Sequence, residues 1–350
     1  MTYQRPNFRH PEAPVNTLGF TRRDYEGSIS TLCAGCGHDS ISAAIIEACF
    51  GLPVAPHRIA KLSGIGCSSK TPAYFLGRSH GFNSVHGRMP SVATGANLAN
   101  QDLVYIGVSG DGDSASIGFG QFAHVVRRNL NMTYIVENNG CYGLTKGQDS
   151  ATADRGSKNK KGSANPYEAI DLASVALQLG ATFVARSFSG DREQLVPLIK
   201  AALSHSGFAF LDVMSPCVTF NNHEGSTKSY IHVRDHLDAA PVDFVPVRDE
   251  IRASYAEGMT TEVRMHDGSV VRLHKDSGQV YNIEDRQAAL RAIAEHDEAG
   301  RTLTGLLYID RDAPDLHKVL GTSRRPLNSL KEKDLCPGSK VLDSINAGLR

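Results

Sequence analysis

The chain has 350 residues, of which 41% are apolar, so it can form one large hydrophobic core or two smaller ones. Lysine and arginine together number 37, as do aspartate and glutamate, so no overall field favours nucleic acid or a membrane surface. The first thirty residues contain no apolar run that could serve as a signal peptide or a membrane span. We therefore expect a cytoplasmic protein whose seven cysteines are thiols or metal ligands rather than disulfides.

The pattern of strands and helices begins after a polar, proline-containing segment at residues 1–28, which predicts an extended N-terminal arm. We expect one α/β domain over residues 29–240. Near its start lies the run Cys33-Ala34-Gly35-Cys36. In a cytosolic chain such a Cys-x-x-Cys pair is a redox pair, half of a zinc site or part of an iron–sulfur site.

Two further cysteines also lie in loops that follow predicted strands. Cys67 is in the glycine-rich run Gly64–Lys70, and Cys217 follows the strand predicted over residues 208–213. Four thiolates, from Cys33, Cys36, Cys67 and Cys217, can hold a [4Fe–4S] cluster or a tetrahedral zinc ion. Their spacing, one pair and two singles, leaves a cluster, a zinc ion and unrelated thiols all open.

The stretch around which the rest is organised joins two apolar runs that read as neighbouring strands. The first, residues 103–108, ends in Gly110-Asp111-Gly112, and the second, residues 132–136, ends in Asn138-Asn139. The segment between them has helical periodicity, so the unit is a right-handed βαβ crossover of a parallel sheet. Open α/β sheets bind ligands at the carboxyl ends of their strands.

Asp111 and Asn139 are therefore expected to face the same ligand. An anionic oxygen and an amide oxygen suit Mg²⁺, which takes few protein ligands together with phosphate oxygens. The glycines beside Asp111 allow the backbone to approach a diphosphate closely. The alternative is an aspartate that only caps the next helix, and the paired Asn-Asn favours the metal.

The loops on either side of this motif contain further candidates. His86-Gly87-Arg88 opens a helix, where it can meet an anion or only cap and pair. The loop Gly140–Gln148 must wrap whatever the two strand ends bind, and Cys141 can offer its backbone carbonyl to a metal. Lys70 and Lys146 are candidate cations for a substrate carboxylate, the alternative being solvated loop charges.

The remaining pattern alternates helix and strand up to residue 213 and completes a doubly wound parallel sheet of about five strands. The chain then changes character, and we expect a C-terminal extension over residues 241–350. It contains a hairpin pattern over 260–273, an amphipathic helix over 284–299 and a polar tail over 311–350. We expect this extension to pack along a partner subunit.

Together these motifs, in this order over residues 30–235, resemble the β subunit of the 2-oxoacid:ferredoxin oxidoreductases. Within them, Gly-Asp-Gly followed by Asn-Asn resembles the motif of thiamin-diphosphate enzymes. The resemblance implies one [4Fe–4S] cluster on Cys33, Cys36, Cys67 and Cys217. It also implies Mg²⁺ on Asp111, Asn139 and the carbonyl of Cys141, although this position is often aliphatic in relatives. Lys70 and Lys146 match positions near the substrate carboxylate. The residues that would surround thiamin diphosphate are Ile65, Gly66, Cys67, Ser68, His86, Gly112, Asp113, Gly143 and Leu144.

The activity that the resemblance implies is thiamin-dependent oxidative decarboxylation of a 2-oxoacid, with 2-oxoglutarate favoured over pyruvate. The acyl group would pass to coenzyme A, and the electrons would pass through the cluster to ferredoxin. The glutamate that activates thiamin would come from an α subunit, which makes αβ or (αβ)₂ the expected assembly. The alternatives are a non-oxidative thiamin-diphosphate enzyme subunit and a regulatory subunit with a degenerate thiamin site.

Overall fold

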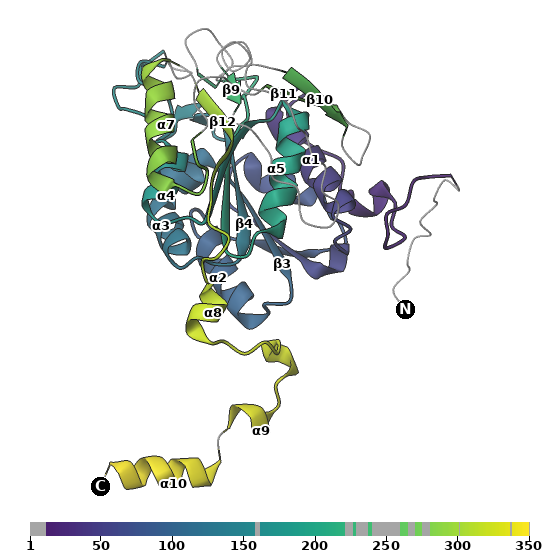
Figure 1. The fold of residues 1–350 in the computed structure, drawn as a ribbon, viewed down its shortest axis with the longest axis vertical. Helices are drawn as coiled ribbons and strands as arrows, with labels where there is room; N and C mark the ends of the chain where they lie inside the picture. Colours follow the sequence, from purple (N-terminus) through teal and green to yellow (C-terminus); the bar gives the residue numbers. More distant parts are fainter. Residues whose placement is uncertain are drawn as a thin grey trace.

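The computed structural model describes residues 12–157, 162–220, 227–228, 237–239, 260–264, 270–274, 281–300, 302–336 and 338–349. Its centre is an eight-stranded sheet with the order β2-β1-β3-β4-β8-β7-β12-β9 (Figure 1). These strands are β1 (Ile59–Ser63), β2 (His80–Asn83), β3 (Val104–Gly110), β4 (Met132–Asn138), β7 (Phe183–Phe188), β8 (Phe208–Met214), β9 (Leu237–Ala239) and β12 (Thr302–Ile309). All neighbouring pairs are parallel except β12 with β7. The predicted doubly wound α/β fold is therefore confirmed.

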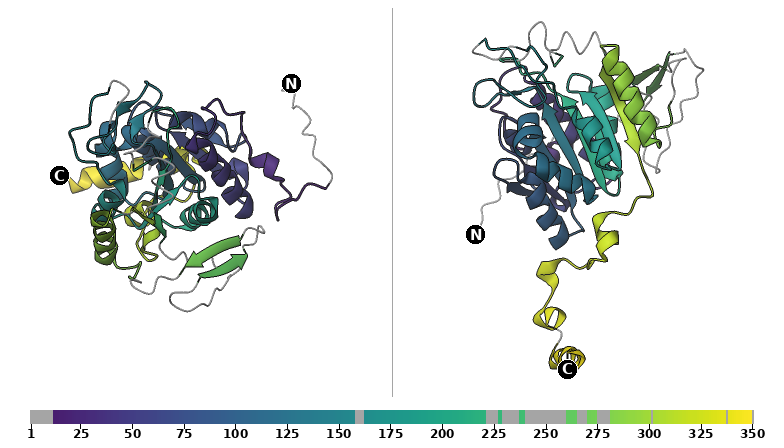
Figure 2. Two further views of the ribbon diagram at one scale, coloured as in Figure 1. Left: turned by 90° about the horizontal axis from the view of Figure 1, so that it is seen from above. Right: turned by 90° about the vertical axis from the view of Figure 1, so that its left-hand side faces the viewer.

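Helices cover both faces of this sheet, as the two views of Figure 2 show. The helices of the body are α1 (Gly37–Gly51), α2 (Met89–Ala99), α3 (Phe119–Arg127), α4 (Leu172–Gln178), α5 (Arg192–Ser204) and α7 (Arg286–Glu298). Helices α1 and α5 pack in one core cluster, and α2, α3, α4 and α7 pack in the other. Every position of β4, β7 and β8 is buried, because a sheet covered on both faces has no solvent side.

The N-terminal segment from residue 12 to residue 28 packs on its own chain. Tyr25 is fully buried and its ring meets Phe20 and Phe50 edge to face. A β-bridge joins Glu26 to Phe75. The part of the predicted arm before residue 12 lies outside the described residues.

The sequence placed a boundary near residue 240, but the chain returns to the main sheet beyond it. Strand β12 pairs antiparallel with β7, and helix α7 buries Ala289, Ala292 and Ile293 against the core. The expected hairpin is present as β10 (Thr260–Arg264) and β11 (Val270–His274), and its turn lies outside the described residues. Pairing of β12 with β7 joins residues more than a hundred positions apart, which local sequence patterns do not reveal.

The crossover between β3 and β4 differs from the expected helix in one respect. A π-helical turn, Gly112–Ile117, precedes α3, so the helix begins only at Phe119. Phe122 and Val126 are buried as the periodicity predicts, whereas Phe119 is 36% exposed. Such π turns occur most often at functional sites. Within the described residues, no helix has the length and apolar character needed to cross a membrane.

Candidate active site

Asp111 and Asn139 lie side by side because β3 and β4 are adjacent parallel strands that end at the same edge. Both side chains are buried, and the backbone N–H of Asn139 donates to Asp111 Oδ1 at 3.3 Å. The amide oxygen of Asn139 accepts from the backbone N–H of Cys141 at 3.0 Å, which holds that residue against the pair.

Two hydroxyl groups that sequence reasoning missed complete the environment of Asp111. Thr152 Oγ1 donates to Asp111 Oδ2 at 2.7 Å, and Ser150 Oγ donates to the same oxygen. Burial raises the pKa of Asp111, and these hydroxyls and the Asn139 amide act in the opposite direction. A cation bound here would offset the cost of burying the carboxylate.

Asp113, the second acidic residue of the motif, holds the loop that carries His86. Its Oδ1 accepts from the backbone N–H of Gly87 at 2.8 Å and lies 2.5 Å from His86 Nδ1, while Oδ2 accepts from Ser109 Oγ at 2.8 Å. Gly87 has a φ of +67°, and a Cβ there would lie 2.6 Å from the Gly118 Cα. The loop can therefore hold His86 at the pocket only with glycine at position 87.

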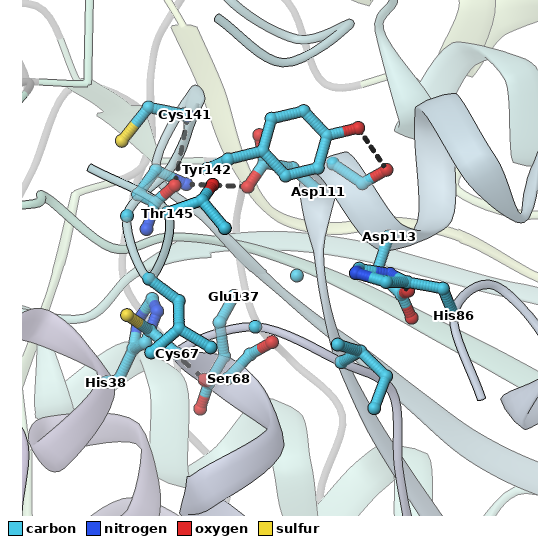
Figure 3. Close-up of a pocket in the computed structure, with 17 residues that line it drawn as sticks. His38, Cys67, Ser68, His86, Asp111, Asp113, Glu137, Cys141, Tyr142 and Thr145 are labelled. Atoms are coloured by element: carbon cyan, nitrogen blue, oxygen red, sulfur yellow. Dashed lines mark hydrogen bonds and ion pairs between the residues drawn. The ribbon is translucent and has the colours of Figure 1, made fainter. Parts of the chain in front are cut away.

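These groups line a pocket of about 120 Å³ (Figure 3). It brings together twelve of the predicted residues: Ile65, Gly66, Cys67, Ser68, His86, Asp111, Gly112, Asp113, Asn139, Cys141, Gly143 and Leu144. It is also lined by residues not proposed from the sequence: His38, Gly110, Glu137, Tyr142 and Thr145. Tyr142 donates from its hydroxyl to the Gly112 carbonyl at 3.1 Å, which closes the loop over the π turn.

His38 and Glu137 lie on the same side of the pocket as Cys67 (Figure 3). Glu137 is fully buried and its carboxyl lies 3.7 Å from His38 Nδ1, which is itself 2.5 Å from Ser215 Oγ. Burial raises the pKa of Glu137 well above its usual value and lowers that of His38 to about 4. Burial thus disfavours the charged form of both side chains.

The four predicted cluster cysteines converge beside the pocket. A Cβ at Gly143 would lie 3.4 Å from Cys67 Sγ and 3.7 Å from Cys217 Sγ, so these two thiols flank the same backbone. Cys33 Sγ accepts from Thr219 Oγ1 at 3.8 Å, two residues after Cys217. Burial, with proximity to Cys217, raises the pKa of Cys36 to about 12. Over the described ranges, no three His, Cys, Asp or Glu side chains form a closed metal-binding group.

The two candidate lysines, unlike the other predicted residues near the cofactor, lie outside the pocket lining. Neither Lys70 nor Lys146 lines the pocket. Lys70 lies in the 3₁₀ helix Ser68–Ala73, close enough to Cys67 to oppose the rise that burial causes in the pKa of that thiol. Lys146 is exposed and has a φ of +80°, which is rare for a residue with a side chain. Of the two cysteines outside these sites, Cys49 is buried in the core and Cys336 is exposed.

The fold and these strand-end residues define a thiamin-diphosphate-binding domain. The family described as "Thiamine pyrophosphate enzyme, C-terminal TPP binding domain" matches residues 64–213, which contain Gly110-Asp111-Gly112 and Asn138-Asn139.

Relatives identify the family within this class. A 2-oxoacid:ferredoxin oxidoreductase subunit beta from a Sulfolobus species is 42% identical over 217 residues, 61% of this chain and 70% of the relative. The 2-oxoglutarate oxidoreductase subunit KorB of Mycobacterium tuberculosis is 40% identical over 213 residues, 58% of this chain and 56% of the relative. The chain belongs to the β subunits of the 2-oxoacid:ferredoxin oxidoreductases.

A solved structure agrees over nearly the whole chain. The 2-oxoglutarate:ferredoxin oxidoreductase from Magnetococcus marinus, with 2-oxoglutarate, coenzyme A and succinyl-CoA bound, is 30% identical with a TM-score of 0.73. The likeness covers 95% of this chain and 98% of that one. The two curated relatives named above are matched over 70% and 56% of their own length, respectively.

Proposed function

We propose that this chain is the thiamin-diphosphate-binding β subunit of a 2-oxoglutarate:ferredoxin oxidoreductase. The observation that carries the proposal is the position of Cys67, which lines the same pocket as Asp111 and Asn139. The proposed diphosphate–metal site and a candidate cluster ligand thus lie on the walls of one pocket. Oxidative decarboxylation with one-electron transfer requires such proximity, whereas a non-oxidative decarboxylase does not.

The donor set fits a magnesium diphosphate. Asp111 offers a buried carboxylate oxygen, Asn139 an amide oxygen and Cys141 a backbone carbonyl, all hard oxygen ligands. A Cβ at Gly112 would lie 2.5 Å from the Tyr142 ring, so the close packing of this ring on the motif requires glycine at position 112. Asp113 holds His86 at the opposite wall, where its other ring nitrogen can meet the cofactor.

Four thiols of one small region fit a [4Fe–4S] cluster with Cys33, Cys36, Cys67 and Cys217 as ligands. Such a cluster takes four cysteine thiolates, which is the number that these loops supply. When bound, thiamin diphosphate supplies the electron sink for loss of CO₂, and the cluster supplies one-electron transfer. The Cys67 loop contributes to both sites and so fixes the distance between them.

The pocket also supports the need for an α subunit. Sites that enclose a small ligand usually have about 300–1,000 Å³, and this pocket has about 120 Å³. Three apolar side chains on the loops around it are exposed: Val85 (72%), Leu144 (50%) and Ile117 (46%). An apolar rim around an incomplete pocket indicates that another protein surface completes it, which is where the activating glutamate would enter.

Lys70 and Lys146 are proposed to bind the carboxylates of the 2-oxoacid. Both lie on loops that flank the pocket lining, at Cys67-Ser68 and at Gly143–Thr145. A dicarboxylate such as 2-oxoglutarate has one carboxylate for each of two separated cations. The choice of 2-oxoglutarate also agrees with the ligand named for the Magnetococcus marinus structure.

The test uses the complex with the α subunit, purified without oxygen. We expect coenzyme A-dependent reduction of a one-electron dye with 2-oxoglutarate and little with pyruvate. Preference for pyruvate would keep the reaction and change the substrate. No reduction with any 2-oxoacid, in a complex that contains thiamin diphosphate and iron, would contradict the proposal and favour a non-oxidative thiamin enzyme.

A further inference from the structure

A chain of hydrogen bonds connects the candidate metal ligand Asp111 to the interior of the sheet. Thr152 Oγ1 lies 2.7 Å from Asp111 Oδ2 and 3.0 Å from the side-chain oxygen of Asn138. Asn138 Nδ2 in turn donates to Asp212 Oδ1 at 3.0 Å. All four side chains are buried, so their polar groups must find most of their hydrogen-bond partners among one another.

The sheet brings the members of this chain together. Strands β4 and β8 are parallel neighbours, and Val136 of β4 is paired with Asp212 of β8. Asn138 follows two residues after Val136, so the side chains of Asn138 and Asp212 lie on the same face of the sheet as diagonal neighbours. The loop beyond the end of β4 then returns and places Thr152 against Asn138. Asp212 is thus linked to the strand end, although it lies inside β8.

Arg186 holds the inner end of the chain. Its Nε lies 3.3 Å from Asp212 Oδ2, and its Nη2 pairs with Asp171. Burial raises the pKa of Asp212, and the positive charge of Arg186 acts in the opposite direction. The arginine therefore favours the carboxylate form of Asp212, and a carboxylate can only accept hydrogen bonds.

An acceptor at Asp212 determines the orientation of the Asn138 amide. The NH₂ group of the amide must face Asp212, so its oxygen must face Thr152, whose hydroxyl is then the donor. The hydrogen of this hydroxyl is directed toward two acceptors, Asn138 Oδ1 and Asp111 Oδ2. A reversed amide would instead donate to Thr152 Oγ1, and the Thr152 hydrogen could then turn from Asp111 toward Ser150 Oγ, which lies 3.1 Å away.

The surroundings of Asn138 leave its orientation to these hydrogen bonds. Asn138, Thr152 and Asp212 line a cavity of about 330 Å³, whereas Asp111 lines the cofactor pocket. Asn138 and Thr152 therefore lie between the two spaces. The side of Asn138 that faces the cavity is not closely packed, so packing alone does not fix which end of the amide points to Thr152. The hydrogen bond to Asp212 does.

We propose that Asp212 is a positioning residue for the magnesium site and acts on Asp111 through Asn138 and Thr152. Groups that hydrogen-bond a metal ligand hold it in the geometry that binds the metal, and their loss typically lowers metal affinity about 10–100-fold. A determinant of cofactor binding thus lies on β8, outside the Gly-Asp-Gly and Asn-Asn motif and outside the pocket lining. The inference rests on the proposed function only in taking Asp111 as the magnesium ligand.

The test is a double-mutant cycle in the αβ complex, freed of cofactor, in which calorimetry measures the dissociation constant of Mg²⁺-thiamin diphosphate. Asp212→Asn keeps the shape of the side chain but can donate to the Asn138 oxygen and reverse the amide, so we expect the constant to rise about three- to tenfold. Thr152→Val removes the hydroxyl and should raise it about tenfold or more. In the Thr152→Val background, Asp212→Asn should cause no further rise, because the connection to Asp111 is already broken.

Two control variants separate positioning from a loss of stability. Asp171→Asn removes the other carboxylate that pairs with Arg186, and Asp171 is bonded to Arg186 and to α4 rather than to Asn138. We expect this variant to change the dissociation constant by less than about twofold, because it lies outside the chain of hydrogen bonds. Thr152→Ser keeps a hydroxyl and should bind the cofactor as the wild type does.

The outcomes separate this inference from the proposed function. Unchanged affinity in Asp212→Asn would overturn the inference, and so would an equal rise with and without the Thr152 hydroxyl. A rise in Asp171→Asn as large as that in Asp212→Asn would overturn it as well, because loss of buried charge would then explain both. The expected cycle in a complex that contains iron and reduces no dye with any 2-oxoacid would support the positioning role and reject the proposed reaction.

Discussion

A substitution of Asp111 tests the proposed metal site without removing any of the candidate cluster ligands. Its carboxylate is buried and held by Ser150 and Thr152, so it lies ready to bind a cation. We expect Asp111→Ala to abolish binding of Mg²⁺-thiamin diphosphate to the αβ complex, measured by calorimetry. Iron content should stay at the wild-type level, because the candidate cluster ligands are other side chains. Retained cofactor binding would exclude Asp111 as the metal ligand.

Cys217 tests the cluster in the same way. We expect Cys217→Ala to lose the iron and the brown colour of the complex, since three thiolates would remain for a cluster that takes four. Cys49→Ala is the control, because that thiol is buried in the core away from the pocket. Iron analysis and visible absorption distinguish the two variants, and unchanged iron in Cys217→Ala would remove Cys217 from the ligand set.

Lys146 combines a proposed binding role with an unfavourable backbone. Its φ of +80° is strained for any residue with a Cβ and readily adopted by glycine. We expect Lys146→Gly to raise KM for 2-oxoglutarate about tenfold, the loss of one carboxylate contact. The same change should stabilise the fold by about 1 kcal/mol, because a residue with a Cβ in the left-handed region costs of order 1–3 kcal/mol and part of this gain is offset by the chain entropy of glycine. Lys146→Ala is the matched control: it should raise KM equally without the gain in stability, measured by thermal unfolding.

The sequence did not reveal every residue of the site. The missed residues reach the pocket through contacts between segments that are distant in the sequence. The pairing of Asp111 with Asn139 followed from two strands and one crossover, and the structure places them together as expected. His38, Glu137 and Tyr142 line the same pocket. His38 follows the Cys-x-x-Cys run and Tyr142 lies in the loop Gly140–Gln148, and no spacing rule links Glu137 to either of them. Lys70 and Lys146 were expected from the resemblance near the substrate carboxylate, and both lie outside the lining.

At the scale of elements, a buried charge cluster joins β7, β8 and the start of α4. The Arg186 side chain is 6% exposed; its Nη2 pairs with Asp171, and its Nε lies 3.3 Å from Asp212 Oδ2. Asp171 also caps α4 by accepting from the backbone N–H of Ala173 and Ser174. Burial alone would raise the pKa of Asp171, but Arg186 outweighs it and the pKa is lowered. Asp212, by contrast, has a raised pKa because of burial.

We expect Asp171→Asn to reduce the free energy of unfolding at pH 7 by about 1–3 kcal/mol, because it removes the charge partner of Arg186 but keeps the cap. A lowered carboxyl pKa stabilises the fold above the unfolded pKa of about 3.9 and loses that effect as pH falls through the folded value. The difference between wild type and variant should therefore shrink in acid. Asp191→Asn, at the cap of α5, is the control without an arginine partner, and urea unfolding measures both.

The whole molecule shows where prediction from local pattern ends. The alternation of strands and helices predicted the parallel core, because each buried strand and amphipathic helix carries its own signal. The antiparallel addition of β12 and the packing of α7 on α4 depend on contacts distant in sequence, so the boundary near residue 240 did not correspond to a break in the fold. Helix α10 (Ser339–Gly348), in the predicted polar tail, has no buried residue within the described chain.

The size of the pocket leads to a prediction for the isolated chain. The proposed metal ligands Asp111, Asn139 and Cys141 all belong to this chain, so we expect the diphosphate end of the site to form without a partner. The remaining volume is too small to enclose the rings, and both carboxyl oxygens of Glu137 are buried away from solvent and lack hydrogen-bond partners. Within the described residues, the pocket therefore does not enclose the rings, and the proposed α subunit would supply both the missing surface and the activating glutamate.

We accordingly expect the isolated chain to bind magnesium pyrophosphate about as tightly as the αβ complex does. Thiamin diphosphate should bind at least about tenfold more weakly to the isolated chain, because its rings gain no enclosing surface. Calorimetry on both preparations measures the two ligands under the same conditions, and dye reduction should require the α subunit. Equal affinity of the isolated chain and the complex for thiamin diphosphate would show that the rings are enclosed by this chain alone, and the role assigned to the apolar rim would be wrong.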